Sequence, residues 1–188
     1  MEARALLDAL HVAERLKDAT RHCYTSGRRH ESVAEHSWRI ALMAMLLGSE
    51  CPYADMNKVI HMCLIHDLGE AFTGDIPAFE KSSADTEKED AAFFSWVDTL
   101  PEPVRAEWKA LLSEMQAMQT EEAKLYKACD KLEAVIQHDE ADISTWLPLE
   151  YDLQLTYGAE NVTFSPYLQA LKAEIDHWTR KKIADSKE

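Results

Sequence analysis

Apolar residues recur at helical spacing along most of this 188-residue chain, and that periodicity constrains the fold more than any other feature. Only five residues are glycine and 46% are hydrophobic, a composition typical of packed helices. We find no internal repeat, no long linker and no convincing strand. The sequence therefore predicts an all-α helical bundle that forms a single domain over residues 1–188. The first predicted helix covers about residues 2–17, with apolar positions at Leu6, Leu7, Leu10, Ala13 and Leu16.

Helix-capping residues indicate where the later helices begin. Ser32-Val-Ala-Glu35 is a capping box, so a helix should begin at Ser32 and turn His36 toward the core. The polar, basic segment 20–30 precedes it. Thr120 should cap a long helix that carries Asp130. Further helices are predicted from near Asp55, around 93–97, after Pro103 and over about 165–182, with a charged tail that should fray from Arg180.

The overall charge and the cysteine pattern exclude several classes of protein. The net charge of −14 at pH 7 argues against binding to nucleic-acid polymers or anionic membranes, because both need broad basic surfaces. The four cysteines form no CxxC pair, so we expect reduced thiols in a cytoplasmic protein. We find no signal-peptide core and no apolar run of membrane-spanning length, and we therefore expect a soluble protein.

Two histidines and two aspartates form the pattern with the clearest chemistry. His66 and Asp67 are adjacent, His36 precedes them on a predicted core face, and Asp130 follows on the long helix. Each residue alone would fit ordinary packing or solvation, but burying an unpaired carboxylate is costly and metal coordination offsets that cost. A mixed nitrogen and oxygen set suits a divalent transition metal, which can lower the pKa of a bound water. The pattern predicts a metal-dependent hydrolase.

The pattern His36…His66-Asp67…Asp130, together with the runs 31–36 and 66–77, resembles the HD-domain phosphohydrolase superfamily. Within it the chain looks most like the bacterial and eukaryotic 5′-deoxynucleotidases, over about residues 16–138. The resemblance implies an HD-domain helical bundle, a homodimer and a small-molecule nucleotide substrate. It also implies that His36, His66, Asp67 and Asp130 bind one divalent transition metal per chain, with Co, Mn, Zn, Ni and Fe as candidates. No histidine lies between Asp67 and Asp130, so we expect a mononuclear centre.

The same resemblance assigns roles to four further residues. Arg21 aligns with an arginine that contacts the substrate phosphate, and a guanidinium can bind phosphate through two hydrogen bonds. Glu70 resembles the catalytic carboxylate, and it can face the metal if its helix continues through Gly69. Asp75 resembles a catalytic residue near the sugar hydroxyl and the phosphorus. His22, a second substrate-binding position, replaces the tryptophan of the bacterial enzymes, so selection against ribose should be weaker.

Three other interpretations stay open at this point. Another HD-type hydrolase would act on a nucleoside triphosphate or a cyclic nucleotide, although few basic residues are present to bind a triphosphate. A non-catalytic regulator would bind metal and nucleotide, but such a protein needs neither Glu70 nor Asp75. A helical scaffold with a chance His-Asp pair would require four coincidences. The remaining histidines are predicted as surface or packing residues, among them His11, His61, His138 and His177.

Overall fold

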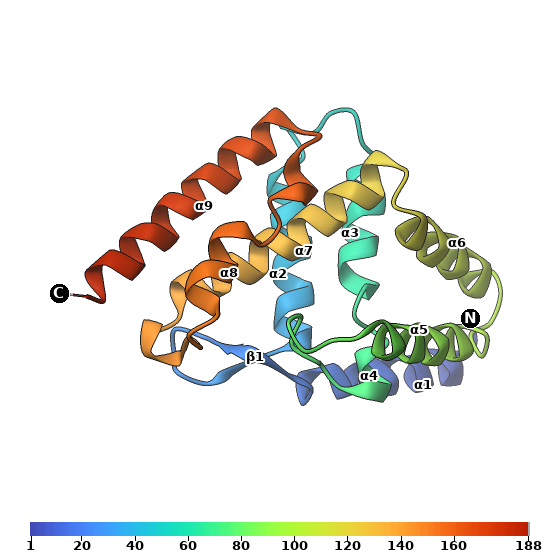
Figure 1. Ribbon diagram of the computed structural model, residues 1–188. Helices are drawn as coiled ribbons and strands as arrows, with labels where there is room; N and C mark the ends of the chain where they lie inside the picture. The colour runs from blue at the N-terminus through green and yellow to red at the C-terminus, as the bar shows by residue number, and fades with distance from the viewer. Residues whose placement is uncertain (188) are drawn as a thin grey trace.

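Helices α2, α3 and α7 form the centre of the molecule, and the other helices surround them (Figure 1). The computed structural model describes residues 1–187 and is predominantly helical, as the sequence predicts. α2 (Val33–Leu46) packs against α3 (Met56–Ile65), and α7 (Glu121–Glu140) contacts both. Each large aliphatic side chain buried between them contributes roughly 1.5–3 kcal/mol. The fully buried side chains include Val33, Ile40, Val59, Met62, Leu125 and Leu132.

Two groups of helices lie on opposite sides of this centre (Figure 1). The first group comprises α1 (Ala3–Glu14), α4 (Glu70–Thr73), α5 (Ser83–Val97) and α6 (Val104–Ala117). The second comprises α8 (Glu150–Thr156) and α9 (Pro166–Asp185), which pack against each other. Short 3₁₀ turns cover Arg15–Lys17, Ile143–Thr145 and Glu160–Val162. The sequence did not indicate α8, which has only seven residues. This helix forms part of the wall of the cavity that is described below.

The last helix extends further than the sequence predicts. We expected fraying from Arg180, but α9 continues to Asp185, so that expectation is wrong. Thr179 is fully buried, and its hydroxyl donates a hydrogen bond of 2.8 Å to Asp139 on α7. This contact holds the C-terminal part of α9 against α7. The sequence alone indicated only a charged, polar tail in this region.

A β-hairpin occupies the polar segment in which we expected no strand. β1 (Thr20–Tyr24) pairs antiparallel with β2 (His30–Ser32). Strands this short, without a run of β-branched residues, give little local signal. Tertiary contacts stabilise the hairpin instead: the side-chain amide of Gln137 on α7 donates a 2.8 Å hydrogen bond to the Tyr24 carbonyl. The hairpin therefore places residues 21 and 22 beside α7.

Most of the predicted helix starts agree with the structure, but α5 begins at Ser83, well before the apolar positions around 93–97 that predicted it. Ser32 and Glu35 form the predicted capping box at the start of α2. Asp55, Thr120 and Ser165 likewise accept hydrogen bonds from the first turns of α3, α7 and α9. However, α3 ends at Ile65 and does not continue through Gly69; a turn follows, and α4 begins at Glu70. His66 and Asp67 therefore lie where the chain changes direction.

The structure also bears on the expectations about cysteines and membranes. All four cysteines are buried free thiols, as predicted for reduced residues. Within residues 1–187, every helix is too short or too polar to cross a membrane.

Candidate metal centre

The four predicted metal ligands meet between α2, α7 and the turn after α3; we call them the HD cluster. His36 comes from α2 and is fully buried, whereas Asp130 comes from α7. His66 Nε2 lies 2.9 Å from Asp67 Oδ2 and 3.8 Å from Asp130 Oδ1. His36 Nε2 lies 3.3 Å from Asp130 Oδ1 and 3.9 Å from Asp67 Oδ2. The fold thus brings together four side chains whose imidazole nitrogens and carboxylate oxygens all face one another.

Hydrogen bonds on the outer side of each imidazole leave the inner nitrogens available to a metal. His66 Nδ1 lies 3.0 Å from the Cys63 carbonyl, which can only accept, so Nδ1 carries the proton. His36 Nδ1 donates in the same way to Glu133, at 2.5 Å. In the neutral rings both Nε2 atoms then present a lone pair, and that of His66 lacks a hydrogen-bond partner among the described residues. Metal-binding histidines are typically held in this way, so the cluster fits a metal ion.

Positive side chains surround the carboxylates of the HD cluster. Burial raises the pKa of Asp130, but Lys127, Lys131 and His36 lower it more, so the net pKa lies well below its usual value. Lys127 Nζ and Lys131 Nζ lie 2.9 Å and 3.4 Å from Asp130 Oδ2. The pKa of Asp67 is lowered against the effect of burial by His66 and His36. Both aspartates are therefore ionised at neutral pH, as metal ligands must be.

Arg21 lies beside the HD cluster on β1. Its Nη1 is 4.0 Å from Asp67 Oδ2, and its Nε is 3.1 Å from Glu31 Oε2. Glu31 is almost completely buried and also accepts a hydrogen bond from the Cys23 thiol at 3.3 Å. Sequence reasoning did not identify Glu31 as an anchor, because it faces Arg21 only once the hairpin has formed. The guanidinium is therefore held in place at the edge of the cluster.

Glu70 and Asp75 lie close to Asp67 of the HD cluster, and the pKa values of both carboxyls are raised. Burial raises the pKa of Glu70 to about 10, and the charges of Asp67 and Asp75 raise it further. Glu70 Oε2 has no hydrogen-bond partner within residues 1–187, and Lys81 Nζ lies 3.9 Å from Oε1. Burial also raises the pKa of Asp75, whereas Arg21 lowers it. A neutral carboxyl at Glu70 can donate a proton to a molecule bound beside it.

One cavity of about 150 Å³ connects these residues. Its wall includes Asp67, Asp130, Glu70, Asp75 and Arg21, together with the cations Lys81, Lys127 and Lys131. His22 also lines the cavity, and its Nε2 lies 3.1 Å from Glu150 Oε1 on α8. In a chain of net charge −14, such a local group of cations favours an anionic ligand. The cavity is therefore lined by two of the predicted metal ligands, Asp67 and Asp130, and by all the residues predicted for catalysis and substrate binding. The other two predicted ligands, His36 and His66, lie next to these aspartates but are not part of the cavity wall.

Comparison with known proteins identifies the family. Residues 13–172 match a family model described as an HD domain. The chain is 35% identical over 162 residues to the 5′-deoxynucleotidase HDDC2 of Dictyostelium discoideum, covering 82% of this chain and 80% of that protein. It is 30% identical over 142 residues to the 5′-deoxynucleotidase HDDC2 of Homo sapiens, covering 73% and 69%. The chain belongs to the HD-domain family, as its ligand pattern predicts.

A solved structure supports the same assignment for the fold. A protein from Magnetospirillum magnetotacticum, described as a predicted metal-dependent phosphohydrolase, superposes with a TM-score of 0.79 at 28% sequence identity. The similarity covers 95% of this chain and 93% of that one. The similarity therefore extends over nearly the whole chain.

Proposed function

We propose that this protein is a metal-dependent 5′-deoxynucleotidase, which hydrolyses 2′-deoxynucleoside 5′-monophosphates to a deoxynucleoside and phosphate. The proposal is carried by one observation: the HD cluster opens into a cavity that also presents an arginine and three lysines. Relatives in Dictyostelium discoideum and Homo sapiens that bear this name resemble the chain over more than two thirds of its length. Metal ligands beside a group of cations suit a phosphate ester.

We further propose that the HD cluster holds one divalent transition-metal ion through His36, His66, Asp67 and Asp130. When bound, the ion supplies Lewis-acid chemistry at the phosphate and lowers the pKa of a water molecule. Imidazole and carboxylate ligands accept Co, Mn, Zn, Ni and Fe, so cellular supply decides among them.

Residues of the chain itself would bind the phosphate and move the proton. Arg21 neutralises charge on the phosphate oxygens, because a guanidinium is charged at every accessible pH. Glu70 carries a proton at neutral pH and can donate it to the leaving 5′-oxygen. Asp75, in the loop after α4, is proposed to contact the sugar and the phosphate. His22 lies at the cavity wall, where the ring is held by its contact with Glu150.

We expect deoxynucleoside monophosphates to be hydrolysed in preference to their ribose counterparts. A close-fitting sugar edge near Asp75 and His22 would leave a 2′-hydroxyl crowded or without a partner, at a cost of about 1–3 kcal/mol. That cost corresponds to roughly 5- to 150-fold in kcat/KM. Because histidine is smaller than tryptophan, His22→Trp should increase the preference. Phosphate release from dAMP and AMP measures both effects.

A wider panel separates this function from its alternatives. Equal kcat/KM values for dAMP and AMP would indicate a general nucleotidase, and faster hydrolysis of AMP would contradict the deoxynucleotidase. Selective cleavage of dATP or of a cyclic nucleotide would indicate another HD-type hydrolase. Nucleotide binding without phosphate release, in protein loaded with each metal in turn, would indicate a regulator.

We also propose that residues 1–188 form one HD domain, that the protein is cytoplasmic and that it forms a homodimer. Partners of other kinds, such as nucleic-acid polymers or membranes, are not expected for a chain of net charge −14. Exposed apolar side chains on α1 and α2 support the dimer, since such groups favour burial. A monomeric mass in light scattering would contradict it. These side chains are Leu6, Leu7 and Leu10 of α1 and Trp38, Met45 and Leu46 of α2.

A further inference from the structure

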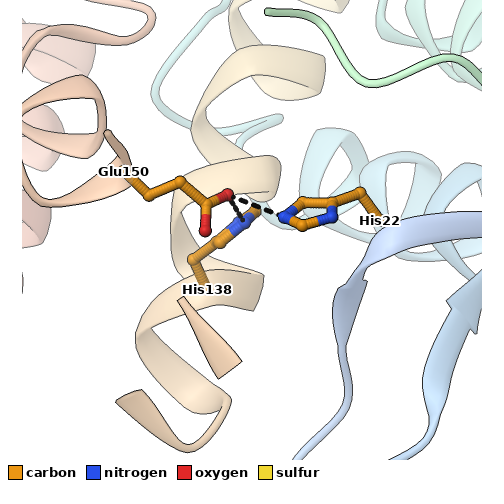
Figure 2. A group of neighbouring side chains, drawn as sticks. All are labelled: His22, His138 and Glu150. Carbon is orange, nitrogen blue, oxygen red and sulfur yellow. Dashed lines mark hydrogen bonds and ion pairs between the residues drawn. The ribbon is translucent and has the colours of Figure 1, made fainter. Parts of the chain in front are cut away.

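A second cluster of potential ligands lies in the cavity wall, apart from the HD cluster. His22 from β1, His138 from α7 and Glu150 from α8 direct their polar atoms at one another (Figure 2). His22 Nε2 lies 3.1 Å from Glu150 Oε1, and His138 Nε2 lies 2.9 Å from the same oxygen. The three ligand atoms lie within 4.8 Å of one another. Side chains from three separate elements thus converge on a single point.

The outer nitrogen of His138 determines what its inner nitrogen can do. Nδ1 lies 2.8 Å from the Ala134 carbonyl, one turn earlier on α7, and a carbonyl can only accept. Nδ1 must therefore be the donor. In the neutral ring Nε2 then presents a lone pair to the carboxylate of Glu150, and two acceptors face each other at 2.9 Å. A cation between them removes that conflict, as either a proton or a metal ion.

The carboxylate of Glu150 is held in a similar way. Its Oε2 accepts a 2.7 Å hydrogen bond from the Leu147 amide, which leaves Oε1 facing the two histidines. The side chain is 1% exposed, so water cannot solvate the charge of the carboxylate. The ring of His22 is positioned by an edge contact with Phe79, at 5.5 Å between centroids. Each of the three groups is thus oriented from outside the cluster, as the ligands of metal sites are.

The two nitrogen–oxygen distances of the cluster are also close to those in a metal shell. Imidazole nitrogens and carboxylate oxygens bind Zn²⁺ at about 2.0–2.2 Å, so ligand atoms around a tetrahedral ion lie about 3.3 Å apart. The two nitrogen–oxygen distances of 3.1 Å and 2.9 Å need only a few tenths of an ångström of movement. Two hydrogen bonds to Glu150 Oε1, one from a protonated His138 and one from Nε2–H of a neutral His22, are the alternative to a metal ion, and the zinc titration below distinguishes the two.

We propose that His22, His138 and Glu150 bind a second divalent transition-metal ion, such as Zn²⁺, separate from the ion of the HD cluster. Three protein ligands leave a position that a water or a donor atom of a molecule in the cavity can take. The expectation of one ion then holds for the HD cluster alone, and the whole chain binds two. The proposal depends on neither the substrate nor the reaction proposed above.

Zinc stoichiometry tests the second site. The chelator-stripped full chain is titrated with Zn²⁺ by calorimetry, and bound zinc is measured after desalting. We expect two ions in the wild type, one in His138→Gln and in Glu150→Gln, and two in the control His177→Gln, whose histidine is exposed on α9. Glutamine at position 150 keeps an oxygen that can accept from the Leu147 amide, so this variant preserves the local fold.

Two results would overturn the second site. One is a wild type that binds a single zinc ion, lost in Asp67→Asn and unaffected by substitutions in the second cluster. The other is a second ion that both glutamine variants retain. Anomalous scattering at the zinc edge from wild-type crystals provides a measurement without any variant: a peak between the three side chains supports the site, and its absence at full occupancy of the HD cluster contradicts it.

Discussion

Asp67→Asn should remove the metal ion from the HD cluster and abolish phosphate release. Asp67 Oδ2 faces both cluster histidines, at 3.9 Å from His36 Nε2 and 2.9 Å from His66 Nε2. The amide that replaces it has similar shape but no charge, and is a much weaker ligand for a divalent cation. Since a bound metal supplies several kcal/mol of transition-state stabilisation, we expect kcat/KM to fall by about 10³-fold or more.

Elemental analysis and thermal unfolding measure the metal loss independently of activity. Metal at about 100 times its dissociation constant should stabilise the folded protein by about 2.7 kcal/mol for each site that it occupies, and Asp67→Asn should lose the contribution of the HD cluster. Asp152→Asn, at an exposed position of α8, serves as the control. A variant that keeps its activity and its metal content would show that Asp67 is not a ligand.

The convergence of the four HD-cluster side chains could be predicted because local signals fix their positions. The capping box at Ser32 determines the start of α2, and therefore the face on which His36 lies. In the same way, the cap at Thr120 determines the start of α7, and therefore the face on which Asp130 lies. His66 and Asp67 are adjacent, so no helix geometry is needed to bring them together. This explains why the interruption of the helix before Gly69 did not disturb the pattern.

The groups that orient these side chains could not be predicted, because they come from distant parts of the chain. Glu133, which holds His36, is 97 residues away from it. His138 was predicted as a surface or packing residue, yet it lines the cavity and faces Glu150 on a helix without a sequence signal. The hairpin that carries Arg21 was missed for the same reason: its stabilising contacts are with α7. Tertiary contacts, and not local propensity, define this part of the site.

Glu70→Gln should keep the metal of the HD cluster and lose most of the catalytic rate, by roughly 10²-fold or more in kcat. The side chain is 4% exposed, and its pKa is raised to about 10, chiefly by burial. A carboxyl with this pKa carries a proton at neutral pH and can deliver it to the leaving oxygen. Glutamine fills the same space and can donate a hydrogen bond, but it cannot transfer the proton.

The pH profile distinguishes proton transfer from a purely structural role. The acid form of Glu70 is the active one, so wild-type kcat should decline as pH rises toward about 10 and the carboxyl ionises. Glu70→Gln should lack that decline, while Glu80→Gln, at an exposed position nearby, should retain both the rate and the profile. If Glu70→Gln instead loses its metal and recovers full kcat when metal is restored, then Glu70 supports the metal and does not transfer the proton.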